Sequence, residues 1–163
     1  MGNIDKMVML PSQGQLGFDY GCGLVSLAYV FFLLGHIRID ELKATIAKLV
    51  SANGNEEKTH IDDLIKASQS ISIKGSINIE AINNPFRYKR TTIPMGKFLL
   101  VPVWYYKVRH WIVVYQDQES LWVIDPWKDN HTWYERFSMA KFYSFYKSST
   151  ANFYRHALLI ESV

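Results

Sequence analysis

The sequence holds one cysteine, Cys22, among its 163 residues, so no disulfide can form within the chain. A reactive thiol survives best under reducing conditions, and we expect the protein to act in a cytosol, either that of the producing cell or that of a target cell entered without a signal. The N-terminal residues lack a basic stretch followed by an apolar core, so we expect no export signal of the usual kind. The longest apolar run, Leu24 to Leu34, is well short of the ~20 residues that a membrane span needs.

Charge of one sign is also scarce. The chain carries 18 Lys and Arg against 15 Asp and Glu, a net charge of +3, and its basic residues are scattered except for Arg87, Lys89 and Arg90. This pattern gives little support to nucleic-acid binding. Neither Cys-x-x-Cys nor His-x-x-x-His spacing occurs in the sequence, and we expect no metal and no other cofactor.

What is present is the composition of a globular protein, with 48% hydrophobic and 15% aromatic residues. A chain of this length can bury a core of its own, and we expect one domain over residues 1–163. Helical spacing of apolar residues gives way to strand-like patterns in the second half, which is typical of the α+β class. The expected elements are helices over 22–34, 39–50 and from 61, extended structure over 71–79, strands over 97–105, 111–115, 121–124 and 154–160, and a short helix over 137–146.

The residues around Cys22 change abruptly in character. The chain is glycine-rich and polar before Cys22, and it is an apolar run of helix-forming length after Gly23. We therefore predict that Cys22 lies in the first turn of a buried helix, where unpaired N–H groups and the helix dipole favour a thiolate. Gly21 and Gly23 would let a substrate approach closely. Free cysteine is also common as a small buried hydrophobe, so a catalytic interpretation needs a partner histidine.

A partner is found in the segment RHWIVVYQDQESLWVIDPW. If the chain turns at the polar tip 116–119, His110 lies opposite Asp125 and Ile112 lies opposite Val123. Directly opposed residues point to the same face of a sheet, within reach of a hydrogen bond. We expect the carboxylate to accept a hydrogen bond from Nδ1 of the imidazole, which leaves Nε2 to act on the thiol. A buried histidine tied to an aspartate can also be purely structural.

In this order, the segments DYGCGLVSLAYV, HWIVVY and VIDPW resemble the papain-like cysteine peptidases, and most closely the bacteriocin-processing peptidases that cut after double-glycine leaders. The match extends from Gln13 to Trp127. It implies a papain-like fold in which a buried cysteine helix packs on a C-terminal antiparallel sheet. It also implies that Cys22 is the nucleophile, His110 the general base and acid, and Asp125 the residue that orients the histidine.

The resemblance further implies a glutamine upstream of the cysteine that stabilises the oxyanion. The family places it six positions before the cysteine, but Leu16 occupies that place here. Gln15 is one residue earlier and Gln13 earlier still. We prefer Gln15, because its glycine-rich neighbours can absorb one extra residue, and we keep Gln13 as the alternative.

The implied activity is hydrolysis of a peptide bond in a protein or peptide, with no cofactor. Rings such as Trp111 and Trp127 would wall a narrow cleft, which suits cleavage after Gly-Gly. The sequence shows neither a membrane span nor a P-loop, so it resembles free-standing peptidases that serve as toxin effectors and need an immunity protein as partner. Two alternatives remain open: an acyltransferase or amidase that uses the same triad, and a peptide-binding module without catalysis.

Overall fold

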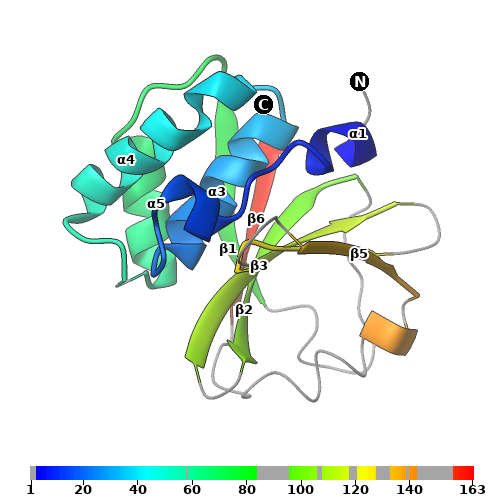
Figure 1. Cartoon of the computed structure of the whole chain (residues 1–163). Helices are drawn as coiled ribbons and strands as arrows, with labels where there is room; N and C mark the ends of the chain where they lie inside the picture. The colour runs from blue at the N-terminus through cyan, green and yellow to red at the C-terminus, as the bar shows by residue number, and fades with distance from the viewer. Residues whose placement is uncertain are drawn as a thin grey trace.

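The computed structural model describes residues 3–57, 59–83, 96–105, 108–117, 121–127, 133–138, 140–142 and 156–163. Helices form the first part of the chain and strands the second, as the α+β prediction requires (Figure 1). The helices are α1 (Asn3–Met7), α2 (Gln13–Leu16), α3 (Cys22–Leu33), the 3-10 helix η1 (Ile39–Glu41), α4 (Leu42–Asn53) and α5 (Ile61–Gln69). The strands are β1 (Ile77–Asn83), β2 (Phe98–Tyr105), β3 (Val108–Gln116), β4 (Leu121–Asp125), β5 (Trp133–Phe137) and β6 (His156–Ser162).

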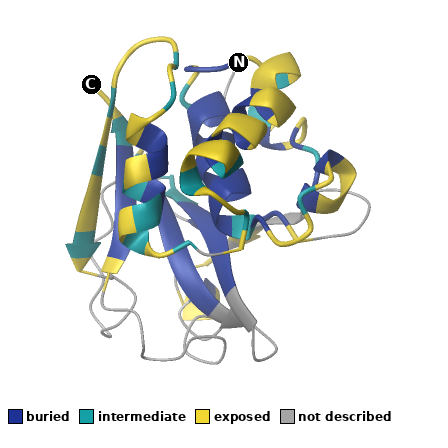
Figure 2. Ribbon diagram, turned by 90° about the vertical axis from the view of Figure 1, so that its left-hand side faces the viewer, coloured by how far each residue is buried: buried dark blue, intermediate teal, exposed yellow. Residues whose placement is uncertain are grey.

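Helix α3 is the centre of the larger core. Every residue from Gly23 to Leu33 is buried, which is expected of a helix that is apolar on all sides. It packs against β2 and β3 of the sheet and against α1, α4 and α5, and Figure 2 shows buried inner surfaces beneath the exposed sides of the outer helices. Ser26, its one strongly polar residue beyond the first turn, donates a hydrogen bond to the carbonyl oxygen of Trp111 at 3.4 Å.

The outer helices follow their amphipathic sequences. The buried residues of α4 are Leu42, Thr45, Ile46 and Leu49, which recur at the spacing of one helix face. Gly54 ends α4 in the left-handed conformation, with φ of 86°, a backbone state that glycine adopts without strain. The predicted helices over 39–50 and from 61 are therefore present. The first of them begins with the 3-10 turn η1 and continues as α4.

The six strands form one antiparallel sheet in the order β1-β6-β2-β3-β4-β5. Successive residues of a strand point to opposite faces, and both faces of the central strands are buried. Leu100 and Val113 pack towards the helices in the larger core. Val101 and Ile112 belong to a second core on the opposite face, which also contains Phe142.

The extended segment predicted over 71–79 and the helix predicted over 137–146 differ from the structure. Strand β1 begins at Ile77 rather than at Ile71. Strand β5 was not predicted, and its last residue, Phe137, lies where we expected a helix to begin. Of that expected helix, residues 140–142 are helical, and 143–146 lie outside the described residues. Strand β6 starts at His156, and residues 154 and 155 of the predicted strand are likewise outside the described part.

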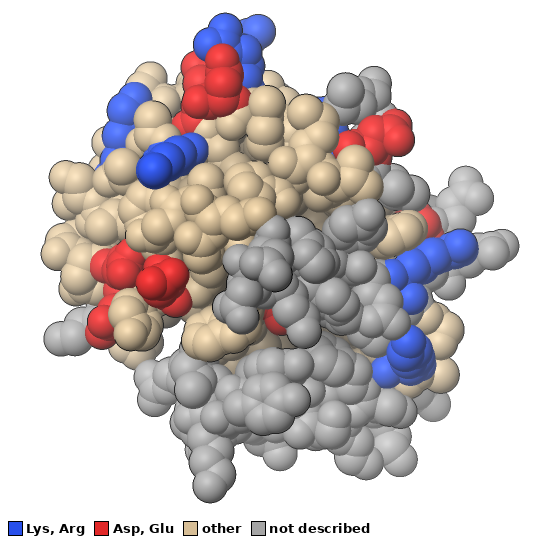
Figure 3. Space-filling view, viewed as in Figure 1, with Lys and Arg blue, Asp and Glu red and all other residues tan. Residues whose placement is uncertain are grey.

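The surface carries charges of both signs. Figure 3 shows Lys and Arg side chains next to Asp and Glu side chains on the face it presents. One ion pair joins neighbouring strands: Nζ of Lys97, just before β2, lies 2.6 Å from a carboxylate oxygen of Glu161 in β6. No helix among the described residues combines the length and the apolar character that crossing a bilayer requires.

Candidate active site

Cys22 is the first residue of α3, as the sequence predicted. The turn before it is fixed by main-chain hydrogen bonds, because the N–H of Gly21 donates to Phe18 at 3.0 Å and the carbonyl of Gly21 accepts from Val25 at 2.8 Å. Cys22 itself is partly exposed. The first N–H groups of a helix have no acceptor within the helix, and the dipole makes that end positive. Cys22 therefore lies at the positive end of α3 and is accessible from outside.

His110 and Asp125 are hydrogen-bonded, as predicted. Nε2 of His110 lies 2.6 Å from Oδ1 of Asp125. Both residues are buried, with exposed fractions of 3% and 8%. The same carboxylate oxygen accepts a hydrogen bond of 2.9 Å from the N–H of Trp127. Two hydrogen-bond partners on one buried oxygen hold the carboxylate in place.

The strand register behind this pair differs from the prediction. Strands β3 and β4 pair Val113 with Ile124 and Val114 with Val123, a shift of two residues from the register in which Ile112 faces Val123. Because the side-chain period of a strand is two, a shift of two keeps every side chain on its face. His110 and Asp125 are therefore diagonal neighbours rather than directly opposed, a distance that long side chains can bridge.

The ring nitrogens of His110 also have the reverse of the expected roles. We predicted that Nδ1 would meet the carboxylate, but Nε2 does so. A diagonal partner lies farther along the sheet, so it is met by Nε2, the ring nitrogen more distant from the backbone, rather than by Nδ1. Cys22 is among the groups that raise the pKa of this imidazole, and Nδ1 is the ring nitrogen that Asp125 does not engage.

The pKa of His110 is raised from 6.5 to about 9. Burial acts in the opposite direction, because an imidazolium loses hydration in the interior. The hydrogen bonds with Asp125 and then with Cys22, together with the negative charges of both groups, outweigh burial. The structure therefore favours the imidazolium form of His110 at neutral pH.

The two upstream glutamines have different surroundings. Gln15, our preferred oxyanion residue, is exposed, and its Oε1 accepts a 2.8 Å hydrogen bond from the N–H of Ser12 in a capping box of α2. Gln13 is buried, and its Nε2 donates to the carbonyl of Asp19 at 2.6 Å. Its main-chain N–H donates to Pro126 at 2.9 Å. Gln13 thus bridges the chain before Cys22 and the turn after Asp125, whereas Gln15 serves the helix cap.

Gly23 and Trp111, predicted to bind substrate, are closely packed in the structure. Trp111 is 5% exposed, and its indole N–H donates to the carbonyl of Thr59 at 3.2 Å. A Cβ on Gly23 would lie 2.6 Å from Oγ1 of Thr59 and 2.9 Å from Cδ1 of Trp111. The close approach that we assigned to substrate at Gly23 is made by these two side chains. Gly21 is also buried, with Phe18 beside it.

One exposed ring lies next to His110. Trp127 is 45% exposed and meets the His110 ring edge-on, with centroids 5.6 Å apart and planes at 90°. The cleft-wall role of Trp127 stays a prediction. Tyr20, which the sequence analysis did not single out, is 63% exposed two residues before Cys22.

Within the described ranges, no group of three or more His, Cys, Asp or Glu side chains is placed so that it could hold a metal ion. The site is instead a helix-start thiol facing a histidine that is held by a buried carboxylate. A thiol, a histidine and a carboxylate are the groups that thiol-dependent acyl transfer uses.

The comparisons with known proteins identify the fold. The chain matches no protein-family model and no curated protein sequence. It is similar in structure to the peptidase domain of Streptococcus ComA, a bi-functional ABC transporter involved in a quorum-sensing pathway, with a TM-score of 0.57, 18% identity, and coverage of 88% of this chain and 93% of that domain. The peptidase domain of Streptococcus mutans ComA matches with a TM-score of 0.43 and 18% identity, over 71% and 85% of the two chains. The papain-like α+β fold expected from the sequence motifs is thereby confirmed.

Proposed function

We propose that this protein is a cysteine endopeptidase that uses Cys22 as nucleophile. The observation that carries the proposal is the 2.6 Å hydrogen bond between His110 and Asp125, which leaves the other ring nitrogen to Cys22 at the start of α3. A metal-free acyl transfer needs a nucleophile, a proton carrier and an orienting group. Cys22, His110 and Asp125 supply the three. The fold of the ComA peptidase domain supports the same activity.

The reaction proceeds in two halves. The Cys22 thiolate attacks the carbonyl carbon of the scissile peptide, and the imidazolium of His110 protonates the leaving amine as the C–N bond breaks. Water then adds to the thioester, with neutral His110 accepting its proton, and the acid product leaves as the thiolate reforms. Asp125 keeps the ring oriented and stabilises its charged form throughout.

The tetrahedral intermediates need donors for their oxyanion. The main-chain N–H of Cys22 is one, because it is the first of its helix. We assign the second to the side-chain amide of Gln13. One N–H of this amide is engaged by the carbonyl of Asp19, and the other is left for the oxyanion.

The substrate that we propose is a peptide cut after Gly-Gly. Trp127 is exposed and its ring meets that of His110, and Tyr20 is exposed two residues before Cys22; bulky rings beside the thiol would favour residues without side chains before the cut. The resemblance of the sequence motifs to double-glycine peptidases supports the same preference. A role as a toxin effector with an immunity partner stays a prediction.

The test is product analysis by mass spectrometry. The chain and its Cys22→Ser variant are incubated with a peptide that contains one Gly-Gly site and with a matched peptide that contains Ala-Ala. We expect the wild type alone to produce two fragments, cut after the second glycine, from the Gly-Gly peptide only. Cleavage elsewhere would refute the Gly-Gly preference and keep the peptidase. Transfer of the acyl group to an added amine without hydrolysis would identify an acyltransferase, and no reaction with any peptide would favour a binding module.

A further inference from the structure

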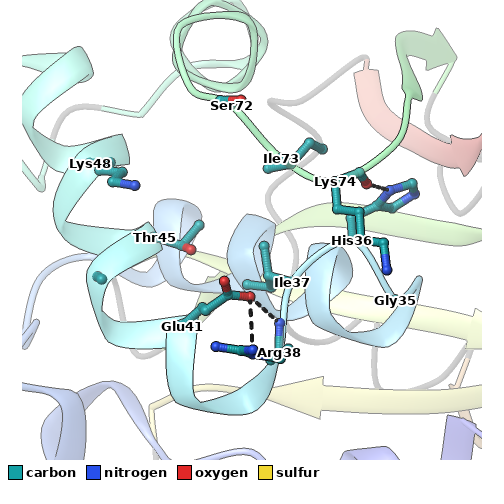
Figure 4. A pocket seen from close by; sticks show the side chains of 11 residues that line it. Gly35, His36, Ile37, Arg38, Glu41, Thr45, Lys48, Ser72, Ile73 and Lys74 are labelled. Atoms are coloured by element: carbon teal, nitrogen blue, oxygen red, sulfur yellow. Dashed lines mark hydrogen bonds and ion pairs between the residues drawn. The ribbon is translucent and has the colours of Figure 1, made fainter.

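A pocket of about 540 Å³ lies at the other end of α3 from Cys22. Its walls are the loop that follows α3, the first half of α4, and the segment 72–74 (Figure 4). Helix α3 has 12 residues, which at ~1.5 Å per residue puts about 18 Å between the thiol and this pocket. Its volume is in the range of ~300–1,000 Å³ that small-molecule sites occupy.

The charge of this pocket is positive. Lys48 lines it from α4 and Lys74 from the opposite wall. Within the part of the chain that the structure describes, neither lysine forms an ion pair. Arg38 also lines the pocket but is 3.1 Å from Asp40. The one lining carboxylate, that of Glu41, accepts a 2.7 Å hydrogen bond from the N–H of Arg38. Two lysines without an ion pair among the described residues therefore line this space.

A hydroxyl also lines this space. Thr45 is one of the lining residues and belongs to α4, and its hydroxyl oxygen is not among the fully buried polar atoms that lack a partner. A hydroxyl can donate to an anionic oxygen. A ligand oxygen at this position would bind to Thr45 and to the lysines together.

The walls are held in place before any ligand arrives. His36 hydrogen-bonds through Nδ1 to the carbonyl oxygen of Lys74, and its Nε2 lies 2.8 Å from Oγ of Ser162. The N–H of Lys74 donates in turn to the carbonyl of His36 at 3.1 Å. The segment that carries Lys74 is therefore fixed against the loop after α3 and the end of β6. A preformed site loses little entropy on binding.

We propose that this pocket binds a small organic oxyanion, a carboxylate- or phosphate-bearing molecule. Lys48, Lys74 and the Thr45 hydroxyl bind its oxygens, and the side chains of Ile37 and Ile73 contact its carbon skeleton. Phosphate and carboxylate offer the same acceptor chemistry to ammonium and hydroxyl donors. The site does not depend on the proposed peptidase activity, because it shares no residue with the thiol site.

Calorimetric titration of the full chain tests the site at low ionic strength, where charge attraction is least screened. Citrate is the carboxylate probe and pyrophosphate the phosphate probe. The pocket variant is Lys48→Ala with Lys74→Ala. The control is Lys43→Ala with Lys66→Ala, which removes the same charge from exposed positions of α4 and α5 outside the pocket. All four lysines are exposed, so both variants keep the fold.

We expect at least one probe to bind, and the pocket variant to raise its Kd by about tenfold or more, as loss of charge-assisted hydrogen bonds does. The control should change Kd by less than about threefold. Thr45→Val, which removes only the hydroxyl, should weaken binding as well, and Cys22→Ala should leave it unchanged. The probe that binds identifies the oxyanion. Absence of heat with both probes, or equal Kd values in the pocket variant and the control, would overturn the proposal.

Discussion

The main-chain N–H of Gln13 donates a 2.9 Å hydrogen bond to the carbonyl oxygen of Pro126. This contact joins the loop before Cys22 to the turn that follows Asp125. The side chain of Gln13 adds a 2.6 Å hydrogen bond to Asp19, three residues before the thiol. The two halves of the site, helical and sheet, are thus connected by one residue.

Replacement of this residue should be costly to catalysis. Gln13→Ala removes an amide that we assign to the oxyanion, and kcat should fall by roughly 100-fold or more. Gln15→Ala removes a side chain of the α2 capping box and should lower stability by about 1 kcal/mol at most with kcat nearly unchanged. Steady-state kinetics and urea unfolding of both variants give the comparison. If Gln15→Ala is the variant that loses kcat, the assignment of Gln13 is wrong.

The protonation of His110 should depend on Asp125. The pKa of His110 is about 9, and Asp125→Asn should lower it, because the neutral amide supplies neither the negative charge nor the same acceptor. Turnover should fall by orders of magnitude with the fold retained. An NMR titration of the imidazole protons in wild type and variant measures the change. An imidazole that titrates near its usual pKa of about 6.5 in both proteins would contradict the ion pair.

Stability should fall as pH rises through the same range. Between the unfolded pKa of 6.5 and the folded pKa of about 9, the native state holds a proton that the unfolded state has released. The stabilisation from the charged histidine is complete below pH 6.5 and is lost as pH passes 9. Urea unfolding at several pH values should therefore show the stability of wild type relative to His110→Gln declining from pH 6.5 to pH 9.5. A difference that grows with pH would contradict the sign of the shift.

Gly23 should tolerate no side chain. Its Cβ would lie 2.6 Å from Oγ1 of Thr59 and 2.9 Å from Trp111, so Gly23→Ala should destabilise the protein by about 1–3 kcal/mol, the usual cost of overpacking. Gly21→Ala is the matched control, because its nearest contact, with Phe18, is 3.3 Å and needs a smaller adjustment. Thermal unfolding compares the two. A larger loss in Gly21→Ala would show that the Trp111 and Thr59 contact is not the tight one.

Much of the site could be predicted from the sequence, and the parts that could not have physical reasons. The start of α3 could be predicted because the sequence changes at Cys22 from glycine-rich and polar residues to a long apolar run. An apolar run of that length has to be buried. The register of His110 and Asp125 was wrong by two residues, since Ile112, Val113 and Val114 are apolar on both faces and provide no alternation that fixes the pairing. The pair survived the error because a shift of two preserves the face.

The choice of ring nitrogen depended on a contact that no sequence pattern encodes. Nε2 of His110 meets Asp125 because the two residues are diagonal in the sheet. The contact of Gln15 could be predicted, because the spacing from Ser12 to Gln15 is a capping-box pattern. The burial of Trp111 could not, because the sequence does not tell which face of a strand meets the helices.

The reactivity of Cys22 tests the central claim most directly. The rate of alkylation by iodoacetamide at pH 6 is measured by mass spectrometry for the wild type, His110→Ala and a model thiol. A thiolate held by the imidazolium of His110 should react much faster than the model thiol at this pH, and His110→Ala should remove the advantage. Equal rates in wild type and His110→Ala would contradict the assignment of Cys22 as the nucleophile.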